Sequence, residues 1–256
     1  MTNGPVKVRF ERDGRLLRLT LDRPKANILD AEMGAALDAA LVEHGTAPAL
    51  RAILVDATGP HFSFGASVEE HLPGRFAAML EGFHRLVLRT FASEVPVMMV
   101  VRGQCLGGGL EFVAAGHLIF AARDARFGQP EIVLGVFAPA ASCLLPERIG
   151  RAAAEDLLLS GRTIDATEAA RIGLVTCLAD DPEATALDYF DRHLAPKSAS
   201  SLRFAVKAAR RAVVERVRGE LARLEALYCD DLMATSDAAE GLDAFLAKRA
   251  PQWKDT

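Results

Sequence analysis

The chain has 256 residues, half of them hydrophobic and a quarter charged, so it can bury a sizeable core in one large domain or two small ones. Its formal net charge of −4 argues against broad nucleic-acid binding, which needs clustered positive charge. Residues 1–10 are polar and lack an apolar signal segment, and no run approaches the ~18 apolar residues of a membrane span. Four widely separated cysteines indicate free thiols and no metal site. We therefore expect a soluble cytoplasmic protein that binds neither nucleic acid nor membrane.

The first elements in chain order are a hairpin and a helix. Residues 6–10 and 16–21 flank the turn signal Asp13-Gly14, which predicts two paired strands. A helix is expected over residues 31–44, with Asp30 as its N-cap.

Three apolar runs and a second helix follow. The runs predict buried strands, at residues 51–56, 97–101 and 118–122. A helix is predicted over residues 76–91, and residues 58–66 form a loop. This alternation of strands and helices favours a layered α/β core with parallel strands.

From Arg151 onward almost the whole chain is predicted to be helical. One apolar stripe runs along residues 202–232 at spacings of three and four. That stripe must pack either on the core or on another subunit. We place a domain boundary near Pro196, between a catalytic core at residues 1–195 and a C-terminal helical region at residues 196–256.

A glycine-rich turn, Gly107-Gly108-Gly109, lies between a predicted strand and a predicted helix. Glycine lets the backbone approach a ligand closely, and the first N–H groups of a helix can hold a phosphate or a developing oxyanion. The chain has neither a P-loop lysine nor a dinucleotide fingerprint here. The alternative is a tight strand–helix turn that binds nothing.

Two acids stand near this turn in the sequence. Glu111 lies in the first turn of the predicted helix, where an acid can simply complement the helix dipole. Glu131 follows Pro130 and precedes an apolar run, and it could be only a turn residue. Two carboxylates beside an anion-binding turn suit proton transfer next to an enolate.

Taken together, these motifs resemble the enoyl-CoA hydratase (crotonase) superfamily over nearly the whole chain. The similar segments are, in chain order, Arg23-Pro24-Lys25-Ala26, Phe64-Gly65-Ala66, Gly107-Gly108-Gly109-Leu110-Glu111 and Phe127-Gly128-Gln129-Pro130-Glu131. The resemblance implies an α/β spiral of ββα turns with C-terminal helices that form trimers, often paired into hexamers. It also implies an acyl-CoA substrate, with no metal or other cofactor.

The resemblance also implies roles for individual residues. The N–H groups of Ala66 and Gly108 would form an oxyanion hole, and Glu111 and Glu131 would be the catalytic acids. Further substrate or CoA contacts are expected from the flanking positions, Lys25, Ala26, Phe64, Gly65, Ser67, Gly107, Phe137 and Lys248. The lysine near the C-terminus would approach the CoA phosphates of a neighbouring subunit.

Several segments depart from ordinary family members. The usual glycine-rich segment after Gly135 is replaced by VFAPAASCLLP, which predicts a compact apolar wall at residues 137–145. RPKANI, HFSFGAS, RGQCLGGGLE, FGQPEI and LGVFAPAASCLLP resemble one subgroup, the cyclohexa-1,5-diene-1-carbonyl-CoA hydratases of anaerobic benzoyl-CoA degradation. The alternatives are a straight-chain hydratase, an isomerase, a thioester hydrolase, or a non-catalytic CoA- or RNA-binding homologue.

Overall fold

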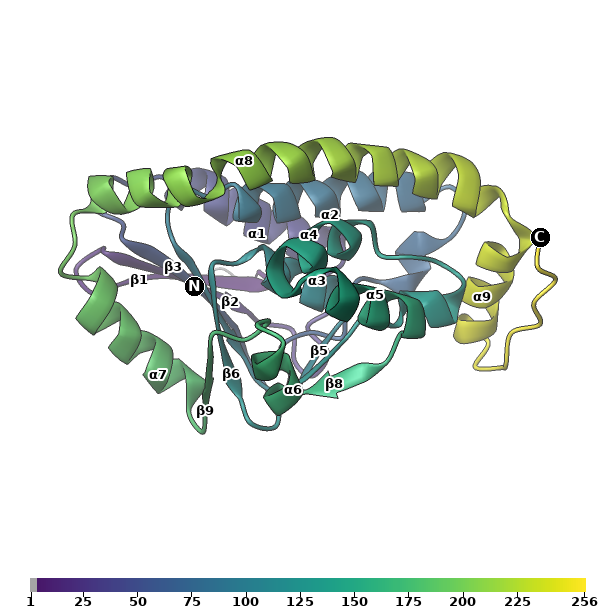
Figure 1. The fold of residues 1–256 in the computed structure, drawn as a ribbon, viewed down its shortest axis with the longest axis horizontal. Helices are drawn as coiled ribbons and strands as arrows, with labels where there is room; N and C mark the ends of the chain where they lie inside the picture. Colours follow the sequence, from purple (N-terminus) through teal and green to yellow (C-terminus); the bar gives the residue numbers. More distant parts are fainter. Residues whose placement is uncertain (1–3) are drawn as a thin grey trace.

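The computed structural model describes residues 4–256, so residues 1–3 of the predicted polar N-terminus lie outside the described residues. A six-stranded sheet forms the centre of the molecule (Figure 1). Its spatial order is β1 (Val6–Glu11), β2 (Leu16–Leu21), β3 (Ala52–Ala57), β4 (Val97–Val101), β6 (Leu118–Ala122) and β9 (Cys177–Ala179). Within this sheet β1 and β2 pair antiparallel and the other neighbouring strands pair in parallel, so the predicted hairpin and parallel core are confirmed.

Strand β4 shows why the predicted strands are continuously apolar. Val97, Met99 and Val101 belong to the main core, which also contains residues of helices α1 (Ala31–His44) and α2 (Phe76–Phe91). The alternate residues Met98 and Val100 belong to a smaller core that includes Ala186 of α7 (Pro182–Tyr189). Because successive side chains of a strand point to opposite faces, a sheet covered on both faces is apolar at every position.

A smaller, three-stranded sheet lies beside the main one. Its order is β5 (Gln104–Leu106), β7 (Arg126–Gly128) and β8 (Thr163–Asp165), with β5 and β7 parallel. The remaining helices of the central region are α3 (Gly108–Ala115), α4 (Pro139–Ile149), α5 (Arg151–Ser160) and α6 (Ala166–Arg171). Single turns follow some strands and helices, at η1 (Val68–His71), η2 (Pro130–Leu134) and η3 (Phe190–Leu194).

Both predicted N-terminal helices form with the predicted bounds. The side chain of Asp30 accepts a hydrogen bond from the Met33 N–H at 2.8 Å, which caps α1 as expected. The prediction that almost the whole chain from Arg151 onward is helical was wrong at β8 and β9. Each of these strands has three residues, too few for an alternating pattern, and pairing with β7 and β6 supplies their structure.

The C-terminal region is a 28-residue helix, α8 (Ala199–Ala226), followed by η4 (Leu227–Asp231), η5 (Leu232–Ala234) and α9 (Ser236–Leu246). Helix α8 runs the length of the molecule above α1, α2 and α4 (Figure 1). Val217, Leu221 and Tyr228 of the predicted stripe are buried in the main core of the same chain. Ala209 of that stripe is exposed in the single chain. Within residues 4–256 no helix combines the length and apolarity that a membrane crossing needs.

Candidate active site

The loop before Ala66 is held by buried polar contacts that the sequence analysis did not predict. The Asn27 side chain donates hydrogen bonds to the carbonyl oxygens of Thr58 and His61, each at 3.0 Å. Ser63 Oγ donates to the Asn27 carbonyl at 2.8 Å and accepts from the Gly65 N–H at 3.0 Å. Asn27 and Ser63 have no exposed surface. The backbone that presents Ala66 is therefore fixed by a buried network.

This loop touches the glycine turn that begins α3. Gly65 has φ +105°, and a Cβ there would lie 2.9 Å from the Leu106 carbonyl oxygen and 3.3 Å from the Gly108 nitrogen. A Cβ on Gly108 would lie 3.1 Å from the Ala66 nitrogen. Within residues 4–256 neither the Ala66 nor the Gly108 N–H donates a hydrogen bond. The two predicted oxyanion donors are thus adjacent and available, one of them at a helix N-terminus.

Gly107 brings the turn against the second acid. Its φ is +52°, a conformation that favours glycine, and its N–H donates to the Gly128 carbonyl at 2.9 Å. A Cβ on Gly107 would lie only 2.7 Å from Glu131 Oε1. The Glu131 carboxyl therefore packs directly on the glycine turn, which the sequence could not show.

Glu111 is buried in the first turn of α3, as predicted, with 5 % of its surface exposed. Its Oε1 accepts a hydrogen bond from the Ala141 N–H at 2.8 Å. Burial raises the pKa of Glu111, because an ionised carboxylate loses hydration. The charge of His84 and the N–H groups of Ala141 and Ala140 act in the opposite direction and lower that pKa.

Glu131 lies in η2, and its Oε2 is buried without a hydrogen-bond partner among residues 4–256. Burial, and then the nearby charge of Glu111, raise the pKa of Glu131 to about 8. The two acids therefore interact electrostatically, and this interaction favours the protonated form of Glu131. Their juxtaposition is what proton-transfer chemistry requires.

Aromatic side chains lie beside these acids. Phe83 of α2 approaches the glycine turn, because a Cβ on Gly108 would lie 3.3 Å from its Cζ. Phe137, a predicted substrate contact, is half-buried and packs edge-on against Tyr228 with ring centroids 5.5 Å apart. Most of the following segment is core, and Pro139, Ala140 and residues 143–145 are buried. Within the predicted apolar wall at residues 137–145, Phe137 is thus the aromatic side chain that is only half-buried.

The other predicted binding residues lie on the surrounding surface. Lys25 and Lys248 are exposed and form no ion pair within the described part of the chain. Phe64 is 42 % exposed, and its N–H donates to the Ala26 carbonyl at 2.9 Å. The Ser67 hydroxyl donates to Glu69 at 3.0 Å.

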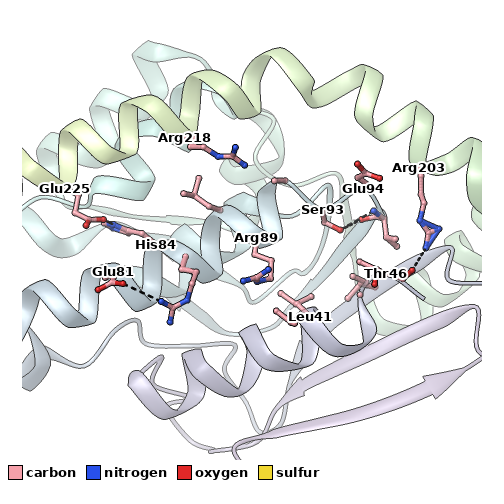
Figure 2. Close-up of a pocket in the computed structure, with 17 residues that line it drawn as sticks. Leu41, Thr46, Glu81, His84, Arg89, Ser93, Glu94, Arg203, Arg218 and Glu225 are labelled. Carbon is pink, nitrogen blue, oxygen red and sulfur yellow. Dashed lines mark hydrogen bonds and ion pairs between the residues drawn. The ribbon is translucent and has the colours of Figure 1, made fainter. Parts of the chain in front are cut away.

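A groove of about 860 Å³ opens between α1, α2 and α8, and none of the predicted site residues lines it. Figure 2 shows His84 of α2 pointing toward Glu225 of α8 at one end of this groove, with His84 Nδ1 2.6 Å from Glu225 Oε2. His84 is 3 % exposed and its Nε2 has no partner among residues 4–256. Sequence reasoning gave His84 no role, because its partner lies 141 residues away.

Comparison with known proteins places this geometry in a family. The sequence profile of the enoyl-CoA hydratase/isomerase family matches residues 11–256. A cyclohexa-1,5-dienecarbonyl-CoA hydratase of Thauera aromatica is 63 % identical over 253 residues, covering 99 % of this chain and 98 % of that protein. A probable enoyl-CoA hydratase of Mycobacterium bovis is 37 % identical over 95 % of this chain and 96 % of its own length.

Solved structures agree with the sequence comparison. The crystal structure of an enoyl-CoA hydratase from Mycobacterium avium superposes with a TM-score of 0.87 at 27 % identity, covering 99 % of this chain and all of that chain. The predicted crotonase-like α/β fold with C-terminal helices is therefore confirmed. The chain belongs to the enoyl-CoA hydratase/isomerase family.

Proposed function

We propose that this protein adds water to cyclohexa-1,5-diene-1-carbonyl-CoA and forms 6-hydroxycyclohex-1-ene-1-carbonyl-CoA, a step of anaerobic aromatic degradation. One observation carries the chemistry. The N–H groups of Ala66 and Gly108, which have no hydrogen-bond partner among residues 4–256, adjoin a glycine turn that packs against Glu131, one of two interacting acids. The 63 % identity to the Thauera aromatica hydratase supports the cyclic substrate.

The thioester carbonyl oxygen would accept hydrogen bonds from Ala66 and Gly108. Both N–H groups are held before any substrate arrives, Ala66 by its loop contacts and Gly108 by the start of α3. Preorganised donors favour the enolate-like transition state over the ground state, in which the oxygen carries less charge.

The two acids would divide the proton transfers. Glu111 accepts a hydrogen bond from the Ala141 N–H, and this bond favours the ionised form of the carboxyl. Glu111 is therefore the proposed base that takes a proton from water. Glu131 has a pKa of about 8 and is the proposed acid that gives a proton to carbon. Since the two carboxyls are electrostatically coupled, the pKa values seen in a titration describe the pair and not either residue alone.

Atoms and electrons balance in a net 1,4-addition. The water oxygen bonds to C2, the ring carbon β to the thioester, while Glu111 takes the water proton. The C1–C2 π electrons pass into the thioester enolate and its extension over C5 and C6. Protonation of C5 by Glu131 leaves one double bond, between C1 and C6, which the product's nomenclature renumbers as C1 and C2. The addition involves no net oxidation or reduction, so proton transfer by Glu111 and Glu131 is sufficient for it.

Coenzyme A would enter as part of the substrate and not as a separate cofactor. The segment with Lys25 and Ala26, the loop with Phe64, Gly65 and Ser67, and the Gly107 turn are the proposed contacts with the thioester and its CoA arm. The exposed Lys248 is the proposed partner of CoA phosphates across a subunit boundary.

We also propose a homotrimer or homohexamer working in the cytoplasm. The C-terminal region exposes large apolar side chains, with Phe204 71 % and Phe245 52 % exposed, and such groups are commonly covered by assembly. All four cysteines are free, as expected in a reducing compartment.

The second candidate is hydration of straight-chain enoyl-CoA, favoured by the 37 % identical relative named as a probable enoyl-CoA hydratase. The test presents cyclohexa-1,5-diene-1-carbonyl-CoA and crotonyl-CoA to the same enzyme and identifies both products by mass spectrometry. We expect a higher kcat/KM for the ring. If crotonyl-CoA is hydrated faster, the linear enoyl-CoA is the substrate and the proposed cyclic substrate is wrong. If neither compound is turned over, the proposed hydratase activity is wrong.

A further inference from the structure

Tyr228 is turned into the interior of the protein by a local change in helix geometry. Helix α8 is largely exposed and buries only Val217 and Leu221 along its 28 residues. It then passes into the π turn η4, in which Tyr228 is 1 % exposed while the preceding Leu227 is 46 % exposed. Wide turns of this kind redirect side chains and recur at functional sites.

The Tyr228 ring is held by two other aromatic side chains. Phe137 lies edge-on to it at 5.5 Å between ring centroids, and Phe76 of α2 lies at 6.3 Å. The three rings come from η4, the segment before α4, and α2, so three separate parts of the chain fix the direction of the phenol. Removing the hydroxyl alone would leave this packing in place.

The hydroxyl of Tyr228 is buried, and it has no hydrogen-bond partner among residues 4–256. Glu131 Oε2 is buried and unpartnered in the same way. Leaving such groups unsatisfied is costly, so a water or ligand oxygen that pairs with the hydroxyl would be stabilised there. Burial, and then the charges of Glu131 and Glu111, raise the pKa of Tyr228, which places the phenol in the field of both acids and keeps it a neutral donor.

We propose that Tyr228 is a third catalytic residue of the hydration, whose hydroxyl donates a hydrogen bond to the oxygen of the attacking water and then to the hydroxyl of the product. This inference rests on the proposed function. The water uses one lone pair to accept from Tyr228 and the other to attack C2, while its protons face the carboxyls of Glu111 and Glu131. Tyr228 keeps its proton throughout, so the balance of the reaction is unchanged.

The inference predicts a difference between two ligands that share the same ring and CoA. The hydroxylated product offers an oxygen to Tyr228, whereas the diene substrate does not. Tyr228→Phe should therefore raise the Kd of the product about tenfold, lower kcat about 10- to 100-fold, and leave the Kd of the diene nearly unchanged. The matched control is Tyr189→Phe, which removes the only other tyrosine hydroxyl of the chain, in a ring that packs on Phe120.

Titration calorimetry in a Glu111→Gln background, which does not interconvert the two ligands, gives the Kd values with and without Tyr228→Phe, and steady-state kinetics of Tyr228→Phe alone gives kcat. A Tyr228→Phe enzyme with unchanged kcat and unchanged product affinity would overturn the inference. Equal weakening of both ligands would also overturn it, since the tyrosine would then only shape the pocket. These outcomes differ from failure of the proposed function, in which the wild-type enzyme hydrates neither ring nor chain.

A second measurement keeps the inference testable if Tyr228→Phe does not fold. Tyrosine labelled with ¹³C at Cζ gives two signals in the wild-type protein, and Tyr189→Phe identifies them. The Cζ shift of a phenol responds to hydrogen bonding. In a Glu111→Gln background, which does not interconvert the ligands, product should move the Tyr228 signal further than diene does. Equal movement by both ligands would reject a bond to the hydroxyl.

Discussion

The carboxylate of Glu111 accepts a hydrogen bond from the backbone N–H of Ala141, with 2.8 Å between Oε1 and the nitrogen. Ala141 lies in the first turn of α4, where backbone N–H groups have no partner within the helix. The start of α4 therefore favours the ionised form of Glu111. Glu131 instead has a buried oxygen, Oε2, with no partner in the described part of the chain. This difference distinguishes the proposed base, Glu111, from the proposed acid, Glu131.

Replacing either acid by its amide should stop turnover without removing the binding site. Glu111→Gln and Glu131→Gln should each lower kcat by at least ~10², because proton transfer is lost while shape is kept. The Kd for a CoA ester should stay within a few fold of wild type. Glu155→Gln removes an exposed carboxyl on α5 and serves as the control. A variant with nearly normal kcat would take that glutamate out of the mechanism.

The pH dependence should follow from the raised pKa values. The proposed acid, Glu131, must be protonated, so kcat should fall as the pH rises through about 8. The proposed base, Glu111, must be ionised, and its raised pKa should move the acidic limb above pH 4.5. A kcat profile of the wild-type enzyme checks both limbs. An activity that stays level up to pH 10 would contradict the assignment of Glu131 as the acid.

Stability should respond to pH through the same carboxyl. The folded protein holds the Glu131 proton up to about pH 8, whereas an unfolded chain releases it near pH 4.5. The folded state therefore binds more protons between these values, and its stability relative to Glu131→Gln should fall as pH rises across that window. The Tm of Glu131→Gln minus the Tm of wild type should therefore increase as the pH rises from 4.5 to 8. A constant difference would show that Glu131 ionises normally in the folded protein.

A methyl group at Gly108 should disable the oxyanion hole. The added Cβ would lie 3.1 Å from the Ala66 nitrogen and 3.3 Å from Phe83 Cζ, so it would crowd the space that the carbonyl oxygen needs. Loss of one such donor typically lowers kcat by about 10²–10³. Gly34→Ala is the matched control, because a Cβ at that position of α1 meets nothing within 4 Å. Equal kcat for Gly108→Ala and wild type would exclude Gly108 as an oxyanion donor.

Phe137→Ala should change the choice between ring and chain. Removing a half-buried ring beside Tyr228 enlarges the proposed acyl pocket. We expect kcat/KM for a longer linear enoyl-CoA to rise relative to kcat/KM for the ring substrate. The change in this ratio should correspond to about 1–3 kcal/mol of transition-state binding. Phe10→Ala, at a 48 % exposed position on β1, is the control. Parallel loss of both activities together with a lower Tm would mean that Phe137 serves only packing.

The assembly should depend on the exposed C-terminal side chains. Light scattering should give three or six times the 27.5 kDa of one chain. Phe204→Asp places a charge at a 71 % exposed apolar position on α8 and should shift the equilibrium toward smaller species. Val8→Asp makes the same kind of change at a 40 % exposed position of β1 and is the control. A wild-type protein that remains a monomer would refute the proposed trimer.

Features whose signal is local could be predicted from the sequence. The Asp30 cap and the apolar run at Val97–Val101 contain their structural information within a few residues, and both form as expected. The same holds for the glycine turn with Glu111 in the first turn of α3. The short strands β8 and β9 could not be predicted, because their structure depends on pairing with distant strands.

Only the tertiary structure determined how the predicted residues meet. The sequence placed Glu131 20 residues after Glu111, but the close approach of its carboxyl to Gly107 requires the folded arrangement of η2 and α3. The raised pKa of Glu131 likewise depends on burial and on the neighbouring charge. Tyr228 was visible in the sequence only as an aromatic residue on a helix stripe. Its hydroxyl, which is buried without a partner among the described residues, became apparent only once η4 was seen to pack against Phe76 of α2.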